Sequence, residues 1–324
     1  MRANPLSVLV VTLAILIPAA VIPAGTVRPP RTVAITIDDL PYTGQPSDLE
    51  TVRQDTGRIL AALVAHDVPA SGFVTGKSVL RPGETDDRLD LLRDWRAAGM
   101  DLENHGFDHV DYVSTSIPAY HDEVAQGMVF PQRVMAETGG RVRWFRAPYN
   151  HSSPDRKKRA ALVSWLTDRD LGLAPFTVEH ADYAWNRVYA DALEREDRET
   201  LERISREYLD HLDRAFAFAE ELSGDTFGRE IPQVFLIHAN AIQAEHLDAM
   251  LARLEERGYR FVSLQKVVTH PAYASEDGYV GPQGLSWLHR WRIAMGMPDR
   301  LRDEPDPPGW VLEAWRSLSS SGAP

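Results

Sequence analysis

Strand-like and helix-like patterns alternate along most of this sequence, and the alternation limits the folds that the chain can adopt. Residues 31–38 (RTVAITID) are rich in β-branched side chains with a period of two, whereas residues 48–66 repeat apolar side chains at helical spacing. Further strand patterns lie at 68–75, 100–105, 141–149, 232–239 and 259–264, with an extended stretch at 171–180. Further helical patterns lie at 86–99, 118–140, 156–170, 191–222 and 244–258. The series predicts an α/β fold with a parallel sheet, open or closed into a barrel.

Four of the predicted strands end in side chains that can perform chemistry. In parallel α/β folds, reactive groups collect at the carboxyl ends of the strands, so these side chains are expected on one rim. They are Asp38, Asp39, His105, His109, Arg146 and His238.

The histidine pair His105 and His109 is a weak metal signal when it is taken alone. With 11 His in 324 residues, random placement gives about 0.4 pairs of this spacing. The coincidence with other reactive groups at strand ends makes metal binding the better interpretation. Because the chain has no Cys, any metal must be bound by His, Asp or Glu.

The formal net charge of −12 argues against two classes of partner. A nucleic-acid binder needs a basic face that neutralises phosphates, and anionic membrane surfaces also attract basic proteins.

Residues 1–25 predict a secretory signal peptide. They combine an early Arg with an apolar run, followed by small residues and prolines. An uncleaved N-terminal anchor is the alternative, because the run approaches the roughly 20 residues that span a bilayer. We expect a soluble, exported protein, periplasmic or extracellular.

Together, the motifs resemble those of the polysaccharide deacetylases of carbohydrate esterase family four, which are related to chitooligosaccharide deacetylases. The first motif is matched by TIDD at 36–39, the second by His105 and His109, the third by RAPY at 146–149 and the fifth by LIH at 236–238. The fourth motif is matched only loosely by HADYAWN at 180–186, and Gly106 replaces the usual Ser or Thr of the second motif.

The resemblance implies a distorted (β/α)-barrel that removes N- or O-acetyl groups from a glycan. It implies that Asp39, His105 and His109 bind a divalent metal ion. Zinc is the first candidate, and cobalt, nickel and manganese are the alternatives.

The resemblance also implies four catalytic residues. Asp38 would be the general base, and Arg146 would orient it and keep it ionised. Asp182 would fix Arg146 from behind. His238 would be the general acid that protonates the leaving group.

Three further residues are expected at the substrate. The backbone N–H of Tyr149 would help to bind the oxyanion, Leu236 would line the pocket for the acyl methyl group, and Trp185 would form a pocket wall or part of the core.

We expect the catalytic domain at 30–272, followed at 273–324 by a Trp- and Pro-rich extension packed on it. The expected partner is an acetylated oligo- or polysaccharide, with no nucleic acid and with membrane contact only through the N-terminal segment. Two alternatives stay open: a metal-dependent amide or cyclic-imide hydrolase on the same scaffold, and a non-catalytic glycan-binding relative.

Overall fold

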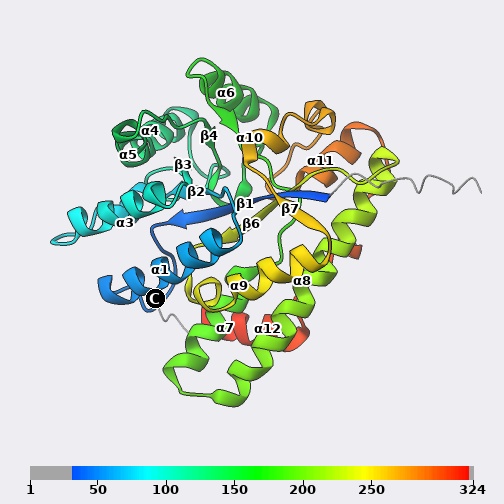
Figure 1. Ribbon diagram of the computed structural model, residues 1–324. Coiled ribbons are helices and arrows are strands. Elements are labelled where there is room, and N and C mark those ends of the chain that lie inside the picture. Colours follow the sequence, from blue (N-terminus) through cyan, green and yellow to red (C-terminus); the bar gives the residue numbers. More distant parts are fainter. Residues whose placement is uncertain (1–30, 321–324) are drawn as a thin grey trace, which may run out of the picture.

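The computed structural model describes residues 31–320 and centres on a seven-stranded sheet (Figure 1). The strand order is β5-β4-β3-β2-β1-β6, and β7 also pairs with β1. Every recorded strand pairing within this described part is parallel. The strands are β1 Arg31–Leu40, β2 Ser71–Val74, β3 Asp101–Asn104, β4 Trp144–Phe145, β5 Gly172–Leu173, β6 Gln233–His238 and β7 Tyr259–Phe261. The sheet curls into a half-barrel, which confirms the predicted distorted (β/α)-barrel.

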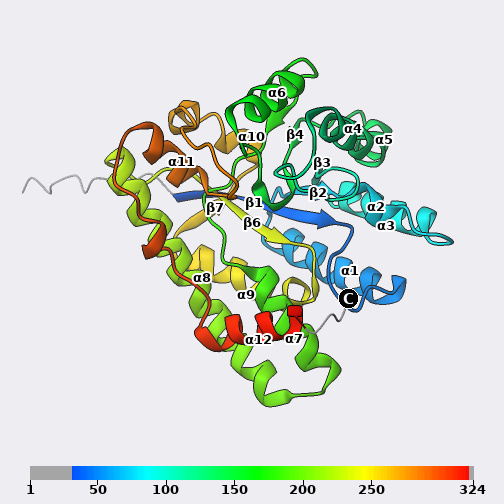
Figure 2. The ribbon, with the colours of Figure 1, turned by 180° about the vertical axis from the view of Figure 1, so that it is seen from behind.

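Helices surround the curled sheet (Figures 1 and 2). In the first half of the chain they are α1 Leu49–Ala65, α2 Gly76–Val79, α3 Thr85–Ala97, α4 Ile117–Gly127, α5 Val129–Glu137 and α6 Arg156–Thr167. In the second half they are α7 Asp182–Glu194, α8 Arg198–Phe227, α9 Ala241–Glu256, α10 Leu264–Val267, α11 Trp287–Ala294 and α12 Gly309–Ser320. Short 3₁₀ turns cover Pro148–Asn150, Pro271–Ala274 and Leu301–Asp303.

The core lies on both faces of the central strands. Ile35 and Ile37 of β1 point into the larger apolar cluster, while Ala34 joins Val234 and Leu236 of β6 in a smaller cluster on the other face. This division follows from the period of two along a strand. Because both faces are buried, the central strands read as nearly continuous apolar runs.

Three predicted elements are corrected by the structure. The helix predicted at 118–140 is two helices, because Pro131 lacks an N–H and its ring conflicts with the carbonyl of residue 127 in a continuous helix. The helical region predicted at 191–222 belongs to α7 and α8, and Asp197 caps the start of α8 by accepting a hydrogen bond from the Thr200 N–H.

The strand predicted at 141–149 is only two residues long, Trp144–Phe145. The Glu103 carboxylate accepts the N–H groups of Arg143 and Trp144 at 2.7 and 2.8 Å, so these donors do not join a sheet ladder. Pro148 then begins a 3₁₀ turn.

The C-terminal segment ends in α12, which packs against α7 (Figure 2). Val311 of α12 is fully buried, and Trp310 lies edge-on to Trp185 of α7. Within residues 31–320, none of the helices combines the length and apolar character of a membrane span. The predicted signal peptide or anchor at 1–25 lies outside the described residues.

Candidate active site

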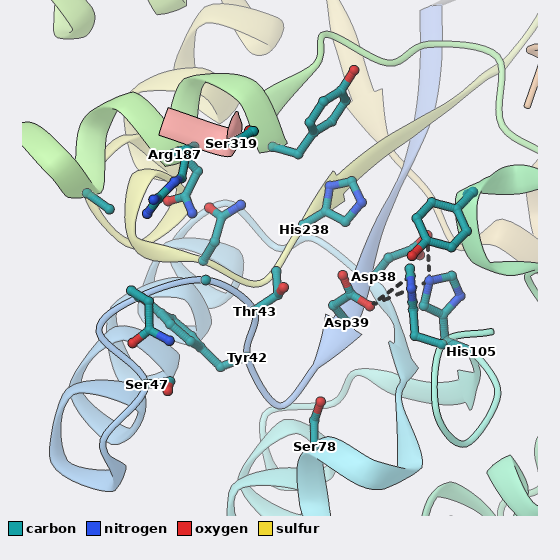
Figure 3. Close-up of a pocket in the computed structure, with 18 of the residues that line it drawn as sticks. Asp38, Asp39, Tyr42, Thr43, Ser47, Ser78, His105, Arg187, His238 and Ser319 are labelled. Carbon is teal, nitrogen blue, oxygen red and sulfur yellow. Dashed lines mark ion pairs between the residues drawn. The ribbon is translucent and has the colours of Figure 1, made fainter. Parts of the chain in front are cut away.

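The carboxyl ends of the central strands open into a cavity of about 1000 Å³ (Figure 3). The register of the sheet explains part of this arrangement, since Asp38 of β1 lies directly opposite His238 of β6. The predicted site residues that line the cavity are Asp38, Asp39, His105, His109, Tyr149 and His238. Five of the six residues predicted at the strand ends therefore line one cavity, and Arg146 is buried outside its lining.

Asp39, His105 and His109 form a compact group of potential metal ligands. One ligand atom from each lies within 4.8 Å of the others. The Asp39 Oδ1 atom is 3.6 Å from His105 Nε2 and 3.5 Å from His109 Nε2, as the dashed lines in Figure 3 mark. A tetrahedral zinc ion with bonds of about 2.0–2.1 Å separates its ligand atoms by about 3.4 Å, so this donor set fits such an ion.

A local backbone conformation turns Asp38 and Asp39 toward the same cavity. Consecutive residues of a regular strand point to opposite faces. Here the pairing of β1 with β2 shifts register between Ile37 and Leu40, and Asp39 has a left-handed φ of 64°. Thr75 donates a hydrogen bond to Asp39 Oδ1 at 3.1 Å. A costly backbone conformation of this kind is often found at a functional site.

His105 is oriented as a neutral ligand. Its Nδ1 atom lies 3.0 Å from the main-chain oxygen of Arg146, which leaves Nε2 facing Asp39. Metal-binding histidines are commonly oriented by a carbonyl partner in this way. Burial lowers the pKa of His105 to about 3, so the imidazole stays neutral at physiological pH.

The buried residue Glu123 holds the loop between the two histidines. Its Oε1 atom accepts the N–H groups of Phe107 and Asp108 at 2.8 and 2.6 Å. A Cβ atom on Gly106 would lie 2.9 Å from the same oxygen. A side chain at position 106 would therefore meet the Glu123 carboxylate. Sequence reasoning missed Glu123, whose only signal is an acidic residue on the inner face of a predicted helix.

Asp38 and Arg146 form a buried ion pair beside the metal ligands. Asp38 Oδ1 accepts a hydrogen bond from Arg146 Nη1 at 2.8 Å, and both side chains are at most 2% exposed. Arg146 also donates to Thr36 Oγ1 at 2.9 Å and to the main-chain oxygen of Pro175 at 2.8 Å. Asp38 Oδ2 faces His105 Nε2 at 3.8 Å.

Asp182 pairs with His238, which corrects the prediction that it fixes Arg146. Its carboxylate accepts from His238 Nδ1 at 2.7 Å and from the His238 main-chain N–H at 2.8 Å. Asn240 and Gln243 also donate to it. Ala181, with a left-handed φ of 51°, starts α7 and sets the position of Asp182.

The pKa values of this pair move apart. Burial opposes the charged imidazole, but the Asp182 carboxylate outweighs it and raises the pKa of His238 to about 10. Burial likewise opposes the charged carboxylate, and His238 still lowers the pKa of Asp182 to about 2. His238 is therefore an imidazolium at neutral pH.

The three expected substrate residues have different positions. Tyr149 lines the cavity, its ring lies edge-on to His109 at 4.6 Å between centroids, and its φ is 57°. Leu236 and Trp185, in contrast, are not part of the cavity lining. Leu236 is buried in the smaller apolar cluster, and Trp185 is a core residue whose Nε1 donates to His211 at 3.0 Å.

Glu179 is a further lining residue that the sequence did not single out. Burial, reinforced by the neighbouring Glu304 charge, raises its pKa to about 7. The charge of His238 acts in the opposite direction and lowers this pKa. Glu179 therefore lies close enough to His238 to add one more carboxyl group at this end of the cavity.

Comparisons with known proteins find a matching family model and similar solved structures. A family model described as polysaccharide deacetylase matches residues 25–164. A mutant of a CE4 family pseudoenzyme with restored enzymatic activity superposes with a TM-score of 0.50 at 23% identity, over 74% of this chain and 68% of that chain. The wild-type pseudoenzyme from Bacillus anthracis superposes with a TM-score of 0.49 at 20% identity, over 74% of this chain and 66% of that chain.

A family 4 carbohydrate esterase from Streptomyces lividans, in complex with acetate, superposes with a TM-score of 0.46 at 21% identity, over 73% of this chain and 95% of that chain. Among the curated proteins, none matches this sequence. The similarity to the pseudoenzyme mutant is a similarity of fold alone.

Proposed function

We propose that this protein is a metal-dependent hydrolase that removes N- or O-acetyl groups from a glycan; the match of residues 25–164 to a polysaccharide deacetylase family model supports this. One observation carries the proposal: a three-ligand group shares one cavity with a carboxylate paired with an arginine and a histidine paired with an aspartate. Hydrolysis of an acyl group needs a base, an acid and stabilisation of the oxyanion, and this arrangement supports all three.

Asp39, His105 and His109 would hold the metal ion. A divalent ion bound there, zinc first, would polarise the acyl carbonyl as a Lewis acid. The neutral state of His105 and its hydrogen bond to a carbonyl support this role.

Asp38 would take the proton from the attacking water. Its Oδ1 atom is occupied by Arg146, whereas Oδ2 faces the metal ligands and is the candidate acceptor. The hydrogen bond from Arg146 fixes the orientation of the carboxylate, which a general base requires.

His238 would give a proton to the departing amine or alcohol. Its Nδ1 atom is committed to Asp182, so Nε2–H is the proton available to the cavity. The imidazolium is already formed at neutral pH. The backbone N–H of Tyr149, another residue of the cavity lining, would donate to the oxyanion.

Acetate release tests the proposal. N-acetylchitotetraose, acetylated xylo-oligosaccharides and p-nitrophenyl acetate are assayed before and after treatment with a chelator, and again after zinc is added back. We expect release from at least one acetylated glycan, lost with the chelator and restored by zinc. Absence of release from every acetylated glycan, together with hydrolysis of a cyclic imide, would instead support the amidohydrolase alternative.

We further propose that the protein acts outside the cytoplasm. The support is the signal-like pattern of residues 1–25. Fractionation of cells that express the full chain tests this, and activity confined to the cytoplasmic fraction would contradict it.

A further inference from the structure

The active-site cavity continues away from the metal ligands to a wall made by α7 and α12. Tyr183, Arg187 and Ala190 of α7 line it at positions i, i+4 and i+7, and Trp315 and Ser319 of α12 line it at i and i+4. This spacing places one face of each helix on the cavity. Figure 3 shows Arg187 and Ser319 on this side, across the cavity from His105. Neither helix lies within the segment 25–164.

Two aromatic side chains form part of this wall. Tyr183 is 47% exposed, and its ring lies edge-on to Trp315 with 5.7 Å between centroids. Exposed aromatic faces of this kind bury the apolar face of a sugar ring, while the hydroxyl groups of the sugar remain free to form hydrogen bonds. A cavity of about 1000 Å³ is at the upper end of the usual range for ligand sites and has room for more than one ring.

Arg187 supplies a positive charge beside the aromatic pair. Its guanidinium donates to the main-chain oxygen of Leu318 at 3.5 Å, and no ion pair with a carboxylate is seen for it within residues 31–320. Other partly buried arginines of the chain do have carboxylate partners, as Arg257 has in Glu220. Arg81, which follows α2, also lines the cavity without a recorded carboxylate partner among the described residues.

The cavity carries charges of both signs. The carboxylates of Asp38, Asp39 and Glu179 lie close to His238, and Glu179 also lies near Tyr183, whereas Arg187 lies on α7 and Arg81 follows α2. In a chain of net charge −12, the half-buried guanidinium group of Arg187 at the cavity wall is suited to bind an anion.

We propose that the wall formed by α7 and α12 is a sugar subsite that selects a carboxylate-bearing glycan. In this arrangement an acidic sugar lies against Trp315 and Tyr183, and its carboxylate pairs with Arg187. An acetylated neighbour in the same chain then reaches the metal ligands. This inference rests on the proposed deacetylase function and names the class of its substrate: an acetylated oligosaccharide that contains carboxylate groups.

Calorimetry with matched ligands tests the subsite directly. Two acidic probes represent the two sources of the carboxylate: hyaluronan tetrasaccharide, which contains uronate, and the GlcNAc–MurNAc disaccharide, which has a lactyl group. Each is compared with its carboxyl-reduced counterpart. We expect at least one acidic probe to bind about 10- to 100-fold more tightly than its neutral counterpart, the size of a charge-assisted hydrogen bond. The preference should shrink as salt is added.

Variants assign the preference to the proposed residues. Arg187→Gln should remove the preference for the carboxylate and leave the affinity for the neutral probe unchanged. Trp315→Ala should weaken acidic and neutral probes alike, by about 2- to 10-fold. Arg316→Gln is the matched control, because Arg316 is exposed on α12 next to Trp315 and is not part of the cavity lining. Circular dichroism verifies that each variant is folded, and Arg187→Lys provides a second substitution that keeps the charge.

The outcomes separate this inference from the proposed function. Equal affinity for both acidic probes and their neutral counterparts, or a preference that survives in Arg187→Gln, overturns the subsite. If acidic sugars bind through Arg187 but no acetylated glycan releases acetate, the deacetylase proposal fails and the subsite stands. If acetate is released from neutral oligosaccharides without any charge preference, the deacetylase proposal stands and the subsite fails.

Discussion

Asp38 and Asp39 are adjacent in the chain but have different partners. Asp38 is paired with Arg146, and Asp39 faces the two histidines. The first environment holds a carboxylate in the orientation of a base, and the second provides a ligand atom for a cation. The same residue type therefore has two proposed roles, which substitution can separate.

The Asp38→Asn and Asp39→Asn variants should lose activity for different reasons. Asp38→Asn removes the proton acceptor, so turnover of an acetylated glycan should fall by about 10²–10⁴-fold while zinc is still bound. Asp39→Asn puts a weaker amide ligand in the metal site and should lower zinc affinity. Elemental analysis of each purified variant, together with acetate release, checks this. Identical metal contents in the two variants would show that the roles are not divided in this way.

Asp182 should control the alkaline limit of activity through His238. The carboxylate raises the pKa of His238 to about 10, so its replacement by a neutral amide leaves burial as the main influence and lowers that pKa. Asp182→Asn should therefore lose the imidazolium at lower pH, and the alkaline limb of the activity–pH profile should move to lower pH. An unchanged alkaline limb would contradict the role of His238 as the acid.

The same pair gives a readout that does not depend on activity. Because the pKa of His238 is raised in the folded protein, its contribution to stability is complete below about pH 6.5 and is lost as the pH rises toward about 10. Thermal melting at several pH values should show this loss in the wild type and a weaker one in Asp182→Asn.

At the scale of elements, α4 positions the loop that carries His109. Glu123 of α4 accepts two main-chain N–H groups of this loop, and His109 itself has a left-handed φ of 54°. A conformation of this kind persists only where its surroundings hold it.

Glu123→Ala should therefore weaken zinc binding by about 10- to 100-fold, as loss of a supporting residue does in other metal sites. Glu123→Gln keeps a carbonyl acceptor and should be affected less. Asp122→Ala, an exposed neighbour on the same helix, is the control. Zinc affinity measured by competition with a chelating dye tests the expectation, and wild-type affinity in Glu123→Ala would refute it.

At the scale of the whole molecule, the proposed metal ion would link strands that are distant in sequence. Asp39 lies near the carboxyl end of β1, and the two histidines follow β3. An ion that binds only the folded chain stabilises it by about 2.7 kcal/mol at a free concentration 100 times its Kd.

Zinc should accordingly raise the melting temperature by about 5–10 °C, given the usual 2–4 °C per kcal/mol for domains of this size class. The His105→Ala/His109→Ala double variant should show no such shift. Differential scanning calorimetry with and without zinc measures both proteins, and an equal shift in the double variant would place zinc elsewhere.

The sequence alone determined the α/β class and most of the rim. Strand periodicity located β1, β3 and β6, and positions at or next to their carboxyl ends supplied Asp38, His105 and His238. This was predictable because the carboxyl ends of parallel strands share one edge of the sheet, so chain-local patterns were enough to bring distant residues together.

Only the tertiary structure decided which partner each of these residues has. Asp182 contacts His238 across 56 residues, and Arg187 contacts the main chain of Leu318 across 131. Neither contact has a local pattern, because the paths of the loops before α7 and before α12 depend on packing against the completed sheet. Periodicity reports which face of its own element a residue occupies. The element that covers that face is set by the burial of apolar surface over the whole chain.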